Sequence, residues 1–336
     1  MYDPTSLDSA PKVRITMMAR ALERIVELER VEGSRTGRAR AGLHWLRHGG
    51  LGRIDAIYVE SSTSTATPFD LAFLALARLR GRTVGVYFRD AYQLFRELFP
   101  VHRARQRAAD LVWRLTTPLL KLIASRRYAP SAGLARVLAL RDAIVLPPGT
   151  DPSQVDLGVP ASRLVAAIVA PTVAAGFDRL SAALEMVRRE VPDVRLRAIT
   201  SATATESLPG WIELVPAARP AIPELVRDAR VCVIPLPLTP YTQVAVPVRL
   251  MDLLAMGKPI VVTGSEAVRE LLGTSGAAVC CDDTPKALGE AIARLILDDD
   301  LAAALGARAR AFALRPDSTW DARAATVVET LVGNAA

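Results

Sequence analysis

The chain has 336 residues, enough for two domains of ordinary size, and 51% of its residues are hydrophobic. Its three cysteines and three histidines follow no metal-ligand spacing, and no segment has the features of a signal peptide or the length of a membrane span. The composition therefore indicates a cytoplasmic protein without a metal site, in which Cys232, Cys280 and Cys281 are small core residues.

Charge is divided unevenly along the chain. Residues 1–150 carry 24 Lys and Arg against 13 Asp and Glu, whereas the remainder carries 18 against 22. A basic surface attracts nucleic acid, anionic lipid or a phosphorylated acceptor. Because no helix-turn-helix, zinc-finger or aromatic RNA-binding motif is present, we expect no nucleic-acid partner.

The first half of the chain alternates helical and strand-like patterns. The predicted elements are helix 11–23, strand 25–30, helix 34–48, strand 55–59, a helix from 68, strand 83–88, a helix within 101–127, strand 128–130, a helix from 131 and strand 143–146. Residues 2–6 are typical of the loop that follows a first strand. We therefore expect that strand either to lie upstream of Met1 or to be missing from the sheet.

Polar residues follow two of these predicted strands. Glu60 and Ser61 open a hydroxyl-rich loop, and Arg89 and Asp90 follow the strand that ends at Phe88. Open α/β sheets bind ligands at the carboxyl ends of their strands, so these four residues are candidates for ligand contact. The alternatives are helix capping by the loop and an Arg89–Asp90 salt bridge that caps the next helix.

The helix within 101–127 is basic and amphipathic. Its apolar residues are interspersed with Arg103, Arg105, Arg107, Arg114, Lys121, Arg126 and Arg127. Such a helix can lie on an anionic membrane surface. It can equally be an ordinary helix that turns its apolar face to the core and a basic side to water.

A linker divides the chain at the sequence 147–152, PPGTDP, because its prolines and glycine forbid a continuous helix. Beyond it the pattern predicts strand 164–169, helix 177–189, strands 194–199 and 211–215, helix 222–229 and strand 231–234. Helices 287–297, 301–312 and 319–332 close the chain. Strands that alternate with helices imply parallel sheets in both halves.

The most informative stretch runs from Thr239 to Thr263. A turn-rich loop leads to a helix that Pro247 opens and Gly257 ends, and a short buried strand follows. Arg249 and Asp252 share one helix face. A cation in a first turn, beside free backbone N–H groups, suits an anion that carries hydroxyls, such as a nucleotide sugar. The alternative is an ordinary surface ion pair.

This stretch resembles a known family. The pattern formed by Pro247, Arg249, Asp252, Ala255, Gly257 and Pro259 is similar to the donor-site helix of GT-B glycosyltransferases of the glycosyl transferase group 1 family. The resemblance extends over about residues 140–330 and implies two doubly wound Rossmann-like domains that face a central cleft. It implies an acceptor-binding domain at 1–147, a nucleotide-sugar-binding domain at 148–318 and a last helix, 319–336, that crosses back to the first domain.

The resemblance also implies site residues. Arg249 would hold the diphosphate, Asp252 would hold ribose hydroxyls, and the loop at Tyr241, Thr242 and Gln243 would approach the sugar. Thr172 and Gly176, in the loop where the family usually carries Arg and Lys, and the later Arg179 complete the donor-side set. On the acceptor side the candidates are Glu60, Ser61, Arg89 and Asp90. No cofactor or metal is implied.

The chain departs from the family pattern at three places. Val244 stands where many members carry a first glutamate, the loop 170–176 has no cation, and the remaining carboxylate is Asp252 rather than a glutamate. The expected function is sugar transfer, with retention, from a nucleoside diphosphate sugar to a glycan or lipid-linked acceptor. The alternative is a catalytically silent GT-B protein that binds a partner or glycan. A GT-B epimerase lacks a supporting set of histidine and carboxylates at strand ends.

Overall fold

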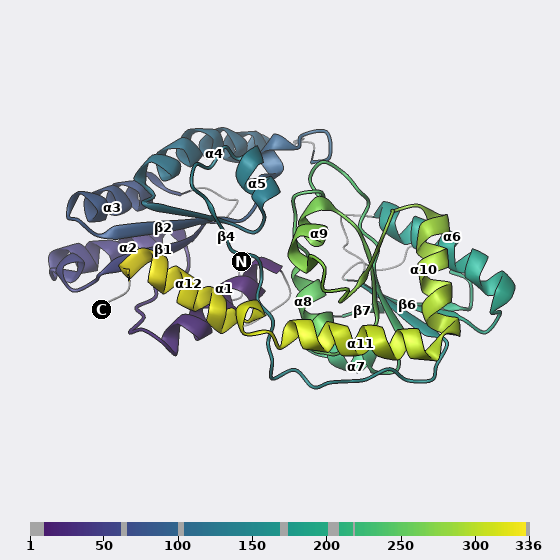
Figure 1. Cartoon of the computed structure of the whole chain (residues 1–336). Coiled ribbons are helices and arrows are strands. Elements are labelled where there is room, and N and C mark those ends of the chain that lie inside the picture. The colour runs from purple at the N-terminus through teal and green to yellow at the C-terminus, as the bar shows by residue number, and fades with distance from the viewer. Residues whose placement is uncertain are drawn as a thin grey trace. The chain divides into compact units, whose positions relative to one another are not determined.

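The computed structural model describes residues 10–61, 66–99, 104–168, 174–200, 208–217 and 219–333. These residues form two compact units, shown in Figure 1. Unit 1 contains the described residues of 10–14 and 148–320, and unit 2 contains those of 15–147 and 321–333. The chain therefore passes from one unit to the other within the first helix, after Pro147 and after Trp320.

Unit 1 is built on a six-stranded parallel sheet in the order β10-β9-β8-β5-β6-β7. Its strands are β5 (Leu164–Ile168), β6 (Arg195–Thr200), β7 (Ile212–Pro216), β8 (Val231–Ile234), β9 (Ile260–Thr263) and β10 (Val279–Cys281). Most of these strands are short apolar runs, as expected for a parallel sheet that helices cover on both faces.

Two hydrophobic cores lie on the two faces of this sheet. Alternate residues of β5 point to opposite faces, so Ala166 belongs to one core and Val165 to the other. Helices α7 (Ile222–Arg227), α8 (Val248–Ala255) and α9 (Glu266–Leu272) cover the first face. Helices α6 (Ala174–Glu190) and α10 (Pro285–Leu297) cover the second, and α11 (Asp299–Ala313) contributes to both cores (Figure 1).

Unit 2 contains a four-stranded parallel sheet in the order β1-β2-β3-β4. The strands are β1 (Ala56–Ser61), β2 (Thr83–Phe88), β3 (Arg126–Ala129) and β4 (Ile144–Val145). The helices of this part of the chain are α1 (Ala10–Glu23), α2 (Arg35–Arg47), α3 (Pro68–Leu79), α4 (Ala104–Ile123), α5 (Ala132–Val137) and α12 (Trp320–Val332). Two parallel sheets with crossover helices confirm the predicted α/β fold class.

Helix α12 packs on the sheet of unit 2 at a glycine. A Cβ on Gly85 of β2 would lie 2.7 Å from Leu331 Cδ2, so the missing side chain makes room for the helix. Next to it, the Tyr128 hydroxyl lies 2.6 Å from the Thr330 hydroxyl. Figure 1 shows α3 and α4 on the other side of this sheet. Helix α12 is therefore part of the core of unit 2.

One predicted strand is wrong. Residues 25–30 form no strand, and the backbone N–H groups of Ile25 and Val26 both donate to Leu22 O at the end of α1. Ile25 is 47% exposed, whereas Val26 and Leu28 are partly buried without a partner strand. The strand predicted at 55–59 is in turn longer than expected, because Glu60 and Ser61 are its last residues. Residues 2–6, which were expected to form the loop after a first strand, lie outside the described residues.

The cysteines are free thiols. Cys232 is buried in β8, and burial raises its pKa to about 12. Cys280 and Cys281 are half-buried in β10. Among the described helices, none combines the length and the apolar character that crossing a membrane requires.

The predicted linker is anchored to the end of α11 and the segment that follows it. Thr150 N donates to Ser318 O at 2.8 Å, and Trp320 N donates to Thr150 O at 3.2 Å. Gly149 lies so close to this segment that a Cβ would stand 2.5 Å from Trp320 N and 2.8 Å from Thr319 C. Since both neighbours are backbone atoms, this position accepts no side chain without a shift of the chain.

We therefore expect Gly149→Ala to destabilise unit 1 by about 1–3 kcal/mol, because it overpacks a backbone contact. Urea denaturation followed by circular dichroism measures the change. Gly210→Ala is the matched control, since a Cβ on Gly210 meets no atom within 4 Å. Equal unfolding midpoints for the two variants would show that the close contact at Gly149 does not constrain the fold.

Candidate functional site

The strand order of unit 1 reverses at β5. From β5 the chain moves to β6 and β7 on one side, and then returns to place β8, β9 and β10 on the other. In open α/β sheets, ligands bind in the crevice at the carboxyl ends of the two strands where the order reverses. Here these strands are β5 and β8, which pair directly. The segments that follow them lead into α6 and α8.

Gly176 brings α6 close to the chain that follows β8. A Cβ at this position would lie 2.2 Å from Pro235 O, and Gly176 itself is buried. A glycine is therefore required for the backbone approach. Thr172, the other residue predicted in this region, lies outside the described residues. The contact places the first turn of α6, with its N–H groups directed toward the helix start, beside the loop that precedes α8.

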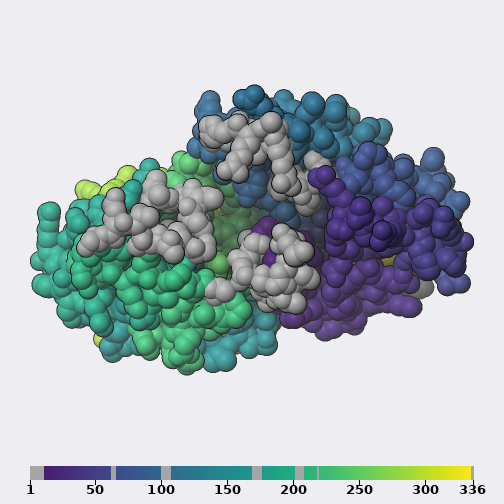
Figure 2. All heavy atoms as spheres, turned by 180° about the vertical axis from the view of Figure 1, so that it is seen from behind, coloured from purple at the N-terminus to yellow at the C-terminus, as the bar shows by residue number. Residues whose placement is uncertain are grey.

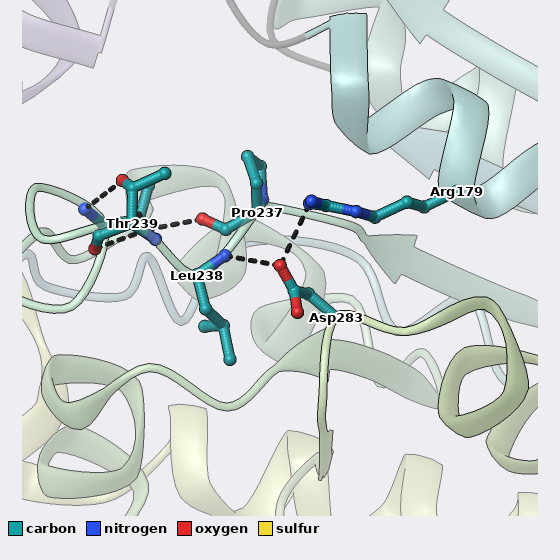
Figure 3. A network of polar contacts seen from close by, with 6 residues as sticks. Arg179, Pro237, Leu238, Thr239 and Asp283 are labelled. Carbon is teal, nitrogen blue, oxygen red and sulfur yellow. Dashed lines mark hydrogen bonds and ion pairs between the residues drawn. The ribbon is translucent and has the colours of Figure 1, made fainter. Parts of the chain in front are cut away.

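Arg179 of α6 joins three segments of this edge. Its Nη1 lies 2.9 Å from Asp283 Oδ2, and the same oxygen accepts a hydrogen bond of 2.8 Å from Leu238 N. Figure 3 shows the carboxylate of Asp283, which follows β10, between the Arg179 side chain and the backbone at Leu238. The cation predicted to compensate for the missing loop cations is therefore held by a carboxylate.

The loop between β8 and α8 is shaped by its own polar groups. Thr239 N donates to Thr242 Oγ1 at 2.8 Å, and Thr242 N donates to Thr239 Oγ1 at 3.2 Å (Figure 3). Gln243 caps the neighbouring helix α9, because its Oε1 accepts from Glu266 N at 2.8 Å and its backbone O from Ala267 N at 2.9 Å. Tyr241, the residue before Thr242, is half-buried. Thr242 and Gln243 thus fix the shape of the predicted donor-site loop.

Helix α8 carries the two residues on which the resemblance depends. Pro247 is its N-cap, Arg249 lies half-buried in its first turn, and Asp252 lies one turn later with 7% of its surface exposed. Val244, at the position of the family's first glutamate, is 5% exposed. The first turn of α8 therefore offers one cation and the polar end of a helix, and no carboxylate at residue 244.

A residue that sequence analysis missed binds Asp252. Arg219, in the short helical turn η3 (Arg219–Ala221) after β7, donates from Nε to Asp252 Oδ2 at 2.9 Å and from Nη2 to Oδ1. The side chains are 12% and 9% exposed, so this is a buried, two-pronged ion pair. A cation near the carboxyl end of a strand is a weak sequence signal, and the pairing of Arg219 with Asp252 depends on how the two segments pack.

Charged side chains from several segments lie at the site edge of unit 1. They include the cations Arg179, Arg219 and Arg249 and the carboxylates Asp252 and Asp283. Arg179 and Arg219 are bound to these carboxylates, by the contacts described above. An anion placed at the first turns of α6 and α8 would meet two helix N-termini and the guanidinium of Arg249 together.

The candidates in unit 2 gather at the carboxyl end of its sheet, because Glu60 and Ser61 pair with Tyr87 and Phe88 in register. Ser61 Oγ donates to Tyr87 O at 2.8 Å, and Glu60 Oε1 accepts from the Tyr58 hydroxyl at 2.8 Å. Beyond the strand, Arg89 Nε lies 2.8 Å from Asp90 Oδ2.

The contacts of the unit 2 candidates are all with other residues of the same unit, so they identify no ligand. Arg89 and Asp90 form the salt bridge of the second alternative, and their side chains are only 12% and 13% exposed. They do not cap the next helical turn, η2 (Tyr92–Leu94), whose N-cap is Ala91 without a side-chain hydrogen bond. The loop residues 62–65 lie outside the described residues. Glu60 and Ser61 stay candidates for ligand contact at the end of β1.

The Arg219–Asp252 pair generates a stability prediction. Arg219→Met should destabilise unit 1 by about 3 kcal/mol, because it leaves a buried carboxylate without its cation. The double variant Arg219→Met with Asp252→Leu should recover much of that loss, and urea denaturation of the wild type, both single variants and the double variant measures the coupling.

Arg227→Met is the control for this prediction. Arg227 and Glu224 are 3.0 Å apart, but their side chains are 53% and 75% exposed. Loss of such a surface pair should cost less than about 1 kcal/mol. If Arg219→Met were as mild as Arg227→Met, the pair at Asp252 would not organise the site.

Comparison with known proteins gives a family match in the second half of the chain and a likeness in fold over nearly all of it. Residues 164–298 match the model of the glycosyl transferases group 1 family. No curated protein matches the chain in sequence. Among solved structures, the chain is similar to the sucrose-phosphate synthase from Thermosynechococcus elongatus, with a TM-score of 0.65 at 13% identity over 98% of this chain and 95% of that one.

Two further structures show how widely this fold is used. WaaG, a glycosyltransferase involved in lipopolysaccharide biosynthesis, has a TM-score of 0.64 at 12% identity over 97% of each chain. A putative UDP-N-acetylglucosamine 2-epimerase from Listeria monocytogenes has a TM-score of 0.52 at 11% identity over 96% of this chain and 94% of that one. At these identities the likeness shows the fold alone. The chain therefore has the fold of these glycosyltransferase structures, and within it residues 164–298 are similar to the glycosyl transferases group 1 family.

Proposed function

We propose that unit 1 binds a nucleoside diphosphate sugar and that the protein transfers the sugar, with retention, to a glycan or lipid-linked acceptor. The observation that carries this proposal is the pair of helix starts, α6 and α8, at the reversal of the strand order, with Arg249 in the first turn of α8. Helix N-termini and cations stabilise the negative charge of a departing diphosphate without a metal ion. The family match over residues 164–298 supports the same assignment.

In this proposal Arg249 holds the diphosphate and the loop at Tyr241, Thr242 and Gln243 approaches the sugar through its backbone. Asp252 accepts hydrogen bonds from the ribose. Its ion pair with Arg219 is compatible with that role, because an ionised carboxylate has about four acceptor sites and Arg219 occupies one on each oxygen. Arg219 then positions the carboxylate.

The acceptor side of the proposal rests on unit 2. Glu60, Ser61, Arg89 and Asp90 lie at the carboxyl end of its sheet, where hydroxyl and charged groups suit a polyhydroxylated acceptor. WaaG acts in lipopolysaccharide biosynthesis, and a comparable acceptor in the cell envelope is the one we propose for this chain.

A second function, binding without catalysis, is favoured by specific observations at the same site. Val244 is buried where the family pattern has a glutamate, and Arg179 is neutralised by Asp283. A site with fewer free charges can hold a glycan or a partner without stabilising a leaving group.

One experiment separates the two functions. The purified chain is mixed with UDP, GDP, ADP, TDP and CMP in a calorimeter, and the sugar form of any nucleotide that binds is then incubated with acceptor extracts. Sugar transfer predicts binding of one nucleotide and acceptor-dependent release of that free nucleotide. Nucleotide binding without acceptor-dependent release would support the non-catalytic protein. Binding of no nucleotide would reject sugar transfer and would also favour the non-catalytic protein.

Arg249→Ala tests the assigned phosphate contact. We expect it to weaken the affinity for the bound nucleotide by about 1.5–3 kcal/mol, since a charge-assisted hydrogen bond to the diphosphate is lost. Calorimetry gives the dissociation constants. Arg189→Ala removes the same charge from the last turn of α6, where the side chain is exposed, and should leave the affinity unchanged. Unaltered affinity in Arg249→Ala would remove this residue from the site.

A further inference from the structure

Helix α4 of unit 2 exposes an apolar surface. The face consists of Leu111, Val112, Leu115, Leu119 and Leu122, which we call the α4 apolar face. Their exposed fractions are 57%, 39%, 62%, 46% and 80%. Spacings of three and four residues place the four leucines on one side of the helix. Figure 2 shows the blue stretch of the chain that includes α4 along the upper edge of unit 2 in that view.

The inward side of α4 is partly polar. Asp110, Thr116 and Thr117 are 6–7% exposed and lie on the covered side, together with Trp113 and Leu120. An ordinary surface helix does the reverse, turning its leucines to the core and its polar groups to water. The interpretation of this segment as an ordinary core-facing helix is therefore wrong for these four leucines.

Cations line one border of the α4 apolar face. Arg107, Arg114 and Lys121 follow at intervals of seven residues, which places them along one side of the helix. Lys121 is half-buried and its Nζ donates to Leu138 O, so Arg107 and Arg114 are the cations of this border that reach the surface. Asp110, the one acidic residue of α4, is turned inward and is bound by Arg96 and Arg114. The exposed surface of α4 thus combines leucines with positive charge and offers no carboxylate.

This combination selects one partner. A second copy of the chain would bring the same cations and no carboxylate from this face to meet them. An anionic lipid surface offers apolar chains for the leucines and phosphates for the border. We propose that the α4 apolar face docks the protein on anionic phospholipid. This role goes beyond sugar transfer, and it would hold the protein where a lipid-linked acceptor lies.

The test uses the full chain and no nucleotide, so its outcome is independent of the proposed sugar transfer. Sedimentation with vesicles of phosphatidylcholine, with and without phosphatidylglycerol, measures lipid binding. The wild type should bind the vesicles that contain phosphatidylglycerol, and added salt should weaken this binding. The triple variant Leu115→Gln, Leu119→Gln and Leu122→Gln should bind at least about tenfold more weakly, because insertion of the leucines is lost.

A matched control makes the same change elsewhere. Val155, Leu297 and Leu314 of unit 1 are 68%, 57% and 48% exposed, and their replacement by Gln should leave vesicle binding unchanged. The replaced side chains in both variants are exposed, so their thermal unfolding should match the wild type. The proposal is overturned if the wild type does not bind the anionic vesicles or if the α4 variant binds like the control. It is also overturned if sedimentation velocity shows a dimer that only the α4 variant dissolves.

Discussion

The candidate donor site depends on how closely α6 approaches the chain that follows β8. Gly176 allows this contact, because any side chain there would collide with the carbonyl oxygen of Pro235. No other residue can replace Gly176 without a shift of the backbone, since the atom that a Cβ would meet belongs to the backbone. It brings the polar start of α6 to the edge at which the strand order of unit 1 reverses. An anion bound at this edge would meet the backbone N–H groups of that helix start.

Two ion pairs then connect the segments that this contact brings together. Arg179 and Asp283 join α6 to the end of β10, with Leu238 N as a third partner. Arg219 and Asp252 join the end of β7 to α8. The second pair is the more buried, so it contributes more to the precision of the site than to its stability: charges removed from water recover their solvation only in good geometry. Because Arg179 and Arg219 are neutralised in these pairs, they do not replace the cations that the loop 170–176 lacks. That balance is the physical reason why transfer and silent binding are both reasonable functions for this site.

Much of the fold was predictable because the spacing of apolar residues along the chain indicates which segments are buried and whether they form helices or strands. Val231–Ile234 and Ile260–Thr263 are continuous apolar runs, and both are fully covered strands. The segment 25–30 was misjudged because alternation alone does not supply a neighbouring strand, and the N–H groups of Ile25 and Val26 bond to Leu22 in a turn after α1 instead. The positions of Arg249 and Asp252 followed from helical spacing. The Arg219 partner of Asp252 did not, because a contact across 33 residues depends on how the segments pack.

The orientation of α4 shows the same limit from another side. Its sequence places four leucines on one side and Trp113 and Leu120 on the other, so the pattern predicts amphipathic character without saying which side meets the core. Packing places Trp113 and Leu120 inside and leaves Leu115 and Leu122 outside. That choice depends on the shape of the sheet surface beneath the helix, which no single segment of sequence encodes.

The central claim is that a nucleoside diphosphate binds where the strand order of unit 1 reverses. A crystal structure of the protein with the nucleotide found by calorimetry tests it most directly. The account predicts the diphosphate at the first turns of α6 and α8, within hydrogen-bond distance of Arg249, and the ribose beside Asp252. A nucleotide bound at the amino ends of the strands, or one whose phosphates do not touch Arg249, would contradict it.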